Sequence, residues 1–376
     1  MVRPLVGAPI GRTVLQTFAG QTPAGERRLF EGLREYTAHL AGFELRVRGL
    51  AFQQQDQGVS ACATTALWSA LHGVAPQECL RVPTPADITE AASRYVLEDG
   101  RALPSAGLSI YQICEATRAA GLAPLLIQGV SLEHDRAQIL AYTDSGFPPV
   151  LAIQPLNGGD GHAVCAVGVK LGDVAPGTDP SLNYRDGASA VRGVYLHDDR
   201  LGPYATAQLD AYTLGPNEIR TRLTIRWPGE PVEFNEAILK ALIVPVPPKL
   251  RLTVARMRGL AAAIAQASAQ LLPRYKDAVT MNCRYQRASA YRERAFEFGL
   301  SDDGLYTLLC GTALSRYIGV LEISVPDGPL LDALLDATET QANPSVLACV
   351  KRRMWPAGAV GKLRPLAKGL GARSII

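Results

Sequence analysis

A single cysteine stands where a glutamine-rich turn meets an apolar helix, in the segment QQQDQGVSACATTALWSAL. Cys62 falls in the first turn of a helix expected from about Ala61 to His72, with Ser60 as a candidate N-cap. A helix N-terminus together with a neighbouring imidazolium lowers a thiol pKa from about 8.5 to as low as about 3–4. Cys62 is therefore a candidate nucleophile, provided that the fold brings a histidine to it.

The chain has five histidines: His39, His72, His134, His162 and His197. His72 lies ten residues along the helix of Cys62, roughly 15 Å away, which is too far to reach the thiol. His39 and His134 fall on segments expected to be amphipathic helices, whose polar faces accept a histidine. His162 follows the turn NGGDG and opens an apolar strand, HAVCAVGVK, that suits the centre of a sheet. A turn histidine without a chemical role is the plainer interpretation of that position.

The next expected strand, VYLHDDRLGPY, ends in two acids that could orient the His162 imidazole. Alternate residues of a strand share a face, so Asp198 faces away from His197 and lies with Leu196. A carboxylate that accepts the second N–H of an imidazole fixes its tautomer and orientation. Asp198 is the expected partner, and Asp199 replaces it if the strand ends one residue earlier. Seen alone, the two acids are a charged strand end before a Gly-Pro turn.

These three features occur in the order that a cysteine hydrolase needs: a cysteine at a helix start, a histidine at a strand start and an acid at the end of the next strand. The fourth part is an oxyanion hole. A side-chain amide shortly before the nucleophile and the backbone N–H of Cys62 can both donate to a developing oxyanion. The four glutamines between Gln53 and Gln57 offer that amide.

Helices come first and a cluster of strands follows, which favours an α+β fold over alternating βαβ units. Residues 24–42 read as a helix and residues 43–52 as a strand. Beyond the cysteine helix, helices are expected over residues 84–97, 107–121 and 133–146, and strands over residues 122–128, 148–156, 161–171 and 191–199. Thr84 and Pro85 give the first of these helices a cap and a first-turn proline.

The second half of the chain carries fewer signals. The Gly/Pro/Asp-rich residues 172–189 read as an excursion loop. A boundary is expected near Pro247-Pro248, followed by a helix over residues 253–272, a strand over residues 315–325 and a short helix over residues 329–338. The predicted organisation is an N-terminal helical extension (1–44), a catalytic domain (45–247) and an additional C-terminal α/β region of unknown role (248–376).

Composition indicates an ordinary globular protein. Apolar residues make up 47% of the 376 residues and charged residues 19%, and the net charge of +3 is too small to argue for nucleic-acid binding. The basic C-terminal tail reads as a solvated or surface-packed end, with binding of a nucleic acid or an acidic partner as the alternative. Seven scattered cysteines without a C-x-x-C pair favour reduced thiols in the cytoplasm over a disulfide framework or a zinc site. The sequence shows no signal peptide and no membrane-spanning run, so no membrane contact is expected.

The segments quoted above resemble a papain-like cysteine peptidase, and more closely the bacterial C39-type branch of that fold. The similarity covers roughly residues 45–210, and GHAVCAVGV is its most specific piece. It implies helices packed on an antiparallel sheet, with Cys62 as the nucleophile, His162 as general base and acid, and Asp198 as the residue that orients His162.

The resemblance also implies an oxyanion glutamine among Gln54, Gln55 and Gln57. Gln57 and Gln55 are favoured because both lie about as far from the thiol as the family's spacing requires. Where the family has an acid-Cys-Gly core, this chain has Ala61-Cys62 followed by alanine.

The expected activity is hydrolysis of a peptide or isopeptide bond in a protein or peptide substrate, through an acyl-enzyme on Cys62. No metal or organic cofactor is implied. An acyltransferase or transglutaminase-type enzyme on the same fold is one alternative, and a catalytically silent scaffold that binds a partner is another. A regulatory partner could bind through residues 248–376.

Overall fold

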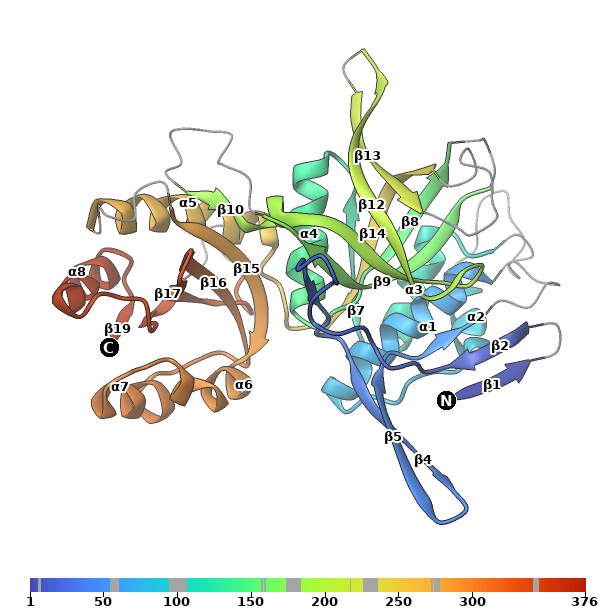
Figure 1. Ribbon diagram of the computed structural model, residues 1–376, viewed down its shortest axis with the longest axis horizontal. Helices are drawn as coiled ribbons and strands as arrows, with labels where there is room; N and C mark the ends of the chain where they lie inside the picture. Colours follow the sequence, from blue (N-terminus) through green and yellow to red (C-terminus); the bar gives the residue numbers. More distant parts are fainter. Residues whose placement is uncertain are drawn as a thin grey trace. The chain divides into compact units, whose positions relative to one another are not determined.

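The chain divides into two compact units (Figure 1). Unit 1 holds residues 1–172 and 191–248, and unit 2 holds residues 173–190 and 249–376. Both contain helices and sheets, so the class is α+β. The computed structural model describes residues 1–5, 8–54, 61–94, 107–156, 158, 160–173, 184–216, 218–225, 236–271, 273, 278–340 and 345–376. None of the helices in these ranges is long and apolar enough to cross a membrane.

The N-terminal region of unit 1 consists of strands. These are β1 (Val2–Leu5), β2 (Ala8–Thr13), β3 (Arg27–Leu29), β4 (Arg34–Leu40), β5 (Phe43–Gly49) and β6 (Phe52–Gln53). The helix expected over residues 24–42 is therefore wrong, and residues 1–44 are not a helical extension but part of unit 1. Ala41 and Gly42 adopt φ angles of 47° and 85°, which form the tight turn that a two-residue β-hairpin requires. His39 accordingly lies on β4 rather than on a helix.

An antiparallel sheet forms the centre of unit 1. It includes β3, introduced above, which pairs with β9. Its other strands are β7 (Ala123–Gln128), β8 (Val150–Pro155), β9 (His162–Leu171), β11 (Val191–Asp198), β12 (Gly202–Gly215), β13 (Glu218–Ile225) and β14 (Glu236–Val246). The strand order is β11-β12-β13-β14-β8-β9, and β9 also pairs with β11, so the pairing closes into a ring. The strands predicted over residues 122–128, 148–156, 161–171 and 191–199 are confirmed.

Four helices accompany this sheet: α1 (Cys62–Val74), α2 (Pro85–Ala92), α3 (Ile110–Ala119) and α4 (Leu132–Asp144). α1, α3 and α4 pack on its strands, and α2 packs on α1 and α3. All four were predicted, and the Thr84 cap of α2 is confirmed as a capping box with Asp87. A single 3-10 turn, η1 (Ala75–Glu78), extends α1. Nearly every residue of α1 is buried, because the helix packs against β8, β9, β11 and β14.

Unit 2 is built on a second sheet with the strand order β10-β15-β16-β17-β18-β19. Its elements are β10 (Arg185–Asp186), η3 (Gly187–Ala190), α5 (Val254–Leu271), β15 (Thr280–Arg287), α6 (Ala288–Glu293), η6 (Ala295–Glu297), α7 (Asp302–Tyr306), η7 (Thr307–Gly311), β16 (Tyr317–Val325), β17 (Gly328–Asp336), β18 (Val346–Lys351), η8 (Ala357–Ala359), α8 (Val360–Gly369) and β19 (Arg373–Ile375). The helix over residues 253–272 and the strand over residues 315–325 are confirmed as α5 and β16.

Two predictions for unit 2 need correction. The short helix expected over residues 329–338 is wrong, because β17 occupies this range between β16 and β18. A strand buried on both faces carries a continuous apolar run, which periodicity cannot separate from a buried helix. The described end of the excursion over residues 172–189 is not only a loop, because β10 joins the unit 2 sheet parallel to β15.

Tyr204 fastens the segment before α1 to the beginning of β12. Its hydroxyl accepts a hydrogen bond from the backbone N–H of Leu50 at 3.0 Å and donates to the carbonyl of Leu15 at 3.2 Å. Tyr204 holds a φ of 61°, in the left-handed region that few side chains adopt. Its ring packs edge-on against His197, with 4.8 Å between the ring centroids. The β11–β12 turn is thereby tied to the chain that leads into α1.

The substitution Tyr204→Phe should lower the free energy of unfolding by about 1–3 kcal/mol, because the buried N–H of Leu50 loses its acceptor. Urea unfolding of both proteins measures the difference. Tyr212→Phe is the matched control, since it removes a hydroxyl from a partly exposed tyrosine of the same strand, and we expect it to change stability by less than about 0.5 kcal/mol. Equal effects of the two substitutions would contradict the role of Tyr204.

Candidate active site

His162 lies at the beginning of β9, next to the end of β11. It pairs with Ile153 of β8 on one side, and on the other side the β9–β11 ladder runs to the pair Cys165 and His197. The side chain is buried, with only 6% of the residue exposed. The strand pairing therefore brings the first residue of β9 close to the acids that end β11.

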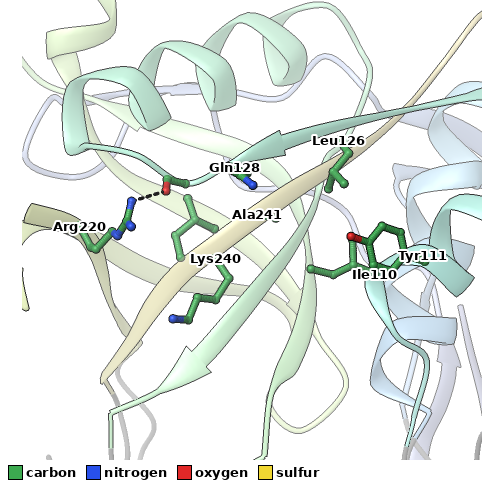
Figure 2. Close-up of a pocket in the computed structure, with 9 residues that line it drawn as sticks. Ile110, Tyr111, Leu126, Gln128, Arg220, Lys240 and Ala241 are labelled. Atoms are coloured by element: carbon green, nitrogen blue, oxygen red, sulfur yellow. Dashed lines mark hydrogen bonds between the residues drawn. The ribbon is translucent and has the colours of Figure 1, made fainter. Parts of the chain in front are cut away.

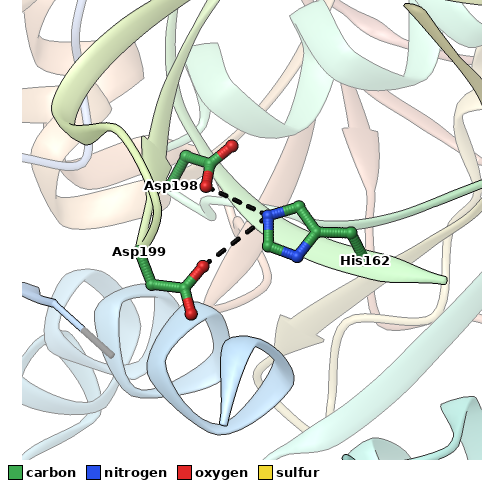
Figure 3. A group of neighbouring side chains, drawn as sticks. All are labelled: His162, Asp198 and Asp199. Carbon is green, nitrogen blue, oxygen red and sulfur yellow. Dashed lines mark hydrogen bonds and ion pairs between the residues drawn. The ribbon is translucent and has the colours of Figure 1, made fainter. Parts of the chain in front are cut away.

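Both acids face the His162 imidazole (Figure 3). The Nε2 atom of His162 is 3.0 Å from Oδ1 of Asp198 and 3.6 Å from Oδ1 of Asp199. Asp198 Oδ1 also accepts a hydrogen bond from the backbone N–H of Arg200 at 3.0 Å. The expected contact between His162 and Asp198 is therefore present. Asp199, which was expected only as a replacement for Asp198, lies beside it instead.

Burial and the charges of neighbouring groups together set the pKa values of this cluster. Burial by itself lowers the pKa of His162, but hydrogen bonds and charges from Asp198 and Cys62 outweigh it and raise the pKa to about 10. Burial raises the pKa of Asp199 to about 6, with the charge of Asp198 adding to the effect and His162 opposing it. At neutral pH the cluster therefore contains a buried imidazolium on His162 next to a largely ionised Asp199.

Cys62 is the first residue of α1, as predicted, and its thiol is half-buried. The N-cap is Ala61 rather than the expected Ser60, which lies outside the described residues, and no described side chain caps the helix. A negative charge on the Cys62 sulfur is one cause of the raised pKa of His162, but within the described residues Nδ1 of His162 makes no hydrogen bond. Nε2 faces the carboxylates, which leaves Nδ1 as the atom available to the thiol.

His197 and His72, neither of which was the expected partner of Cys62, both pack against aromatic rings. His197 is buried between the rings of Phe52 and Tyr204, and burial lowers its pKa to about 3. It faces away from the cluster, as the strand alternation predicted. His72 packs edge-on against Trp68, and burial lowers its pKa to about 4. Both imidazoles are therefore neutral at physiological pH.

The glutamine predictions fall largely outside the described residues. Gln55 and Gln57 both lie there and remain predictions. The side-chain carbonyl of Gln53 accepts from Nε of Arg12 at 2.9 Å, and that of Gln54 accepts from the backbone N–H of Ile10 at 3.1 Å. These two contacts hold β6 against the N-terminal strands. Gln54, the third candidate that the family resemblance offers, thus has a structural contact.

The same cluster has the donor set of a metal site. One ligand atom each of His162, Asp198 and Asp199 lie within 4.8 Å of one another, and all three residues are buried. Within the described part of the chain, Oδ2 of Asp198 and both carboxylate oxygens of Asp199 accept no hydrogen bond. One imidazole and two carboxylates fit a divalent transition-metal ion. The two adjacent acids were visible in the sequence, but they were interpreted only as alternative partners of His162 and not as joint metal ligands.

The search for relatives was negative: no protein-family model matches the sequence, and no curated protein matches it. Function must therefore be argued from the geometry of the cluster.

The pKa of His162 makes a direct prediction about stability. Because the folded-state pKa is about 10 and the ordinary value is 6.5, the folded protein binds this proton more tightly. The resulting stabilisation is complete below about pH 6.5 and is lost as the pH rises through about 10. The difference in free energy of unfolding between the wild type and His162→Gln should shrink by at least about 2 kcal/mol from pH 6.5 to pH 10.

Urea titrations at both pH values measure this difference, and groups that titrate alike in both proteins cancel. His72→Gln is the matched control, because His72 stays neutral across the window and its difference should not change. Parallel pH profiles for the wild type and His162→Gln would show that His162 is not held protonated.

Proposed function

We propose that this protein is a papain-like cysteine hydrolase that cleaves a peptide or isopeptide bond through an acyl-enzyme on Cys62. The observation that carries the proposal is the environment of one imidazole. Nε2 of His162 lies 3.0 Å from Asp198, its buried Nδ1 makes no hydrogen bond within the described residues, and a negative charge on Cys62 would raise its pKa. Within the described residues no side chain caps the N-terminus of α1, and a thiol at a helix N-terminus beside an imidazolium is the arrangement that activates a cysteine nucleophile.

The architecture supports the same proposal. A buried helix that begins at the cysteine packs on a closed antiparallel sheet, and this sheet supplies the histidine and the acid from adjacent strand ends. Papain-like enzymes combine these parts in this way, as the sequence resemblance implies. Unit 2 is additional to that fold, and its role as a site for a regulatory partner remains a prediction.

In the proposed reaction the Cys62 sulfur attacks the substrate carbonyl carbon, and the imidazolium of His162 gives its proton to the departing amine. The product of this step is a thioester on Cys62. His162, now neutral, takes a proton from water, which attacks the thioester; this releases the carboxylic acid and restores the Cys62 thiolate and the His162 imidazolium. Asp198 holds the imidazole in position and stabilises its charged form.

The oxyanion of each tetrahedral intermediate needs donors. The backbone N–H of Cys62 at the beginning of α1 is one, because the first turn of a helix has free N–H groups. Gln55 or Gln57 is the proposed second donor. An amine instead of water would resolve the same thioester as an acyl transfer, and product analysis with a labelled amine acceptor distinguishes the two outcomes.

Labelling with iodoacetamide at pH 5.5, followed by intact-mass analysis, tests the proposal. We expect one adduct to form at least about 100-fold faster than the others, because an ordinary thiol is only about 0.1% ionised at this pH. The fast adduct should disappear in Cys62→Ala and slow at least about 10-fold in His162→Gln. Cys79→Ala removes an exposed thiol and is the matched control that should keep it. Labelling of all cysteines in proportion to their exposure would contradict the proposal.

A metal-dependent function is the second candidate, and it is favoured by the three carboxylate oxygens of Asp198 and Asp199 that accept no hydrogen bond from any described residue. The two candidates compete for one atom, since a metal ion on Nε2 of His162 would displace the proton that faces Asp198. A metal site would therefore remove the imidazolium on which the cysteine mechanism depends.

Chelation distinguishes the two candidates. If the cysteine proposal is correct, the purified protein should contain far less than one equivalent of divalent metal, and EDTA should leave the fast labelling of Cys62 unchanged. Added micromolar Zn²⁺ should slow that labelling by occupying the cluster, and Asp199→Asn should reduce this inhibition at least about 10-fold. One tightly bound equivalent in the purified protein, lost in Asp199→Asn, would instead favour the metal candidate.

A further inference from the structure

A second feature of unit 1 is a cavity of about 310 Å³ between α3, β7, β13 and β14 (Figure 2). It forms where β14 changes partners. β13 pairs with β14 as far as Ile238, and β7 pairs with it from Ala241 onward. Nη1 of Arg220 donates to the carbonyl of Gly129 at 2.9 Å and joins the two partner strands across the gap.

Lys240 lies in this cavity because of a β-bulge. Leu239 pairs with Ile153 of β8 and Ala241 pairs with Ala152, so Lys240 is an extra residue on β14. Bulges re-aim side chains and often occur beside functional sites. Lys240 is exposed, and within the described residues its amino group makes no ion pair or hydrogen bond.

The cavity is positively charged and partly apolar. The nine described residues that line it include Arg220 and Lys240 but no acid. Arg220 is already held by Glu218, with Nε 2.9 Å from the carboxylate, so Lys240 is the cation that remains for a ligand. Tyr111 and Leu126, which are 57% and 41% exposed, provide the apolar wall. Such a cavity suits a carboxylate attached to a small apolar group.

The strand register places this cavity near the proposed catalytic cluster. Leu239, Ile153 and His162 pair side by side on three neighbouring strands. Two strand spacings are about 10 Å, which an extended peptide covers in about three residues. α1, which begins at Cys62, and α3, which lines the cavity, pack on each other and on β14.

We propose that this cavity binds an acidic side chain of the substrate about three residues from the bond that is cleaved, with Lys240 as the residue that determines this specificity. The position of the acidic side chain relative to the cleaved bond rests on the proposed hydrolase function, whereas binding of an acidic side chain in the cavity can be measured without catalysis.

Two capped peptides test the inference: acetyl-Ala-Leu-Asp-Ala-amide and the same peptide with Asn in place of Asp. Dissociation constants are measured by ligand-observed NMR with the full-length Cys62→Ala protein, so that neither peptide is consumed. We expect the Asp peptide to bind about 10-fold more tightly, as a charge-assisted contact to Lys240 allows. The additional substitution Lys240→Gln should reduce this preference to within about 2-fold.

Two further variants are the controls. Lys240→Arg keeps the charge in the cavity, and Lys249→Gln removes an equal charge from another exposed lysine; both should retain the preference. Equal binding of the two peptides, binding of neither, or a preference that survives Lys240→Gln would overturn the inference.

The labelling of Cys62 in the wild-type protein separates this result from the proposed function. Fast labelling without a preference for Asp rejects the acid-binding cavity alone. A preference for Asp without fast labelling supports the cavity as an acid-binding site and rejects the cysteine hydrolase.

Discussion

The contact between His162 and Asp198 is the interaction on which the rest of the site depends. Burial alone would keep this imidazole neutral, as it does for His197 one strand away. The Asp198 carboxylate at 3.0 Å reverses the effect and holds a proton on His162 well above neutral pH. Removing either partner would leave an uncompensated buried charge, which is among the most destabilising changes in a folded protein. The charged pair therefore stabilises the contact between the beginning of β9 and the end of β11, in addition to its proposed role in catalysis.

Three distant segments must meet for this contact to include Cys62, and the closed ring of strands brings two of them together. The β9–β11 pairing places the beginning of one strand beside the end of the next, although 35 residues separate His162 from His197. Tyr204 then ties the β11–β12 turn to the backbone of Leu50, on the path that leads to α1. The site is thus assembled from strand ends and a helix end, the positions at which a side chain is fixed by the scaffold without filling its core.

The sequence was informative at these element boundaries. Cys62, His162 and Asp198 each stand next to a local signal, a turn or a cap, and such signals do not depend on the remainder of the fold. The helix expected over residues 24–42 failed because its apolar spacing fits a helix and a hairpin equally well. The helix expected over residues 329–338 was wrong because β17 is a buried central strand, and such a strand has no polar–apolar alternation to reveal it. The bulge at Lys240 follows from how two strands pair, which no local pattern contains.

The presence of two acids at the end of β11 explains why one cluster supports two chemical interpretations. A single carboxylate suffices to orient an imidazole, so Asp199 is more than a Cys-His-Asp arrangement needs. Its oxygens lack hydrogen bonds in the described structure, and burial already favours its protonated form. Either a proton or a cation can compensate the second carboxylate. The proton on Nε2 of His162 leaves the thiol of Cys62 with an activating imidazolium, whereas a metal ion on that atom does not. The protonation of His162 is therefore the property that decides between the two interpretations.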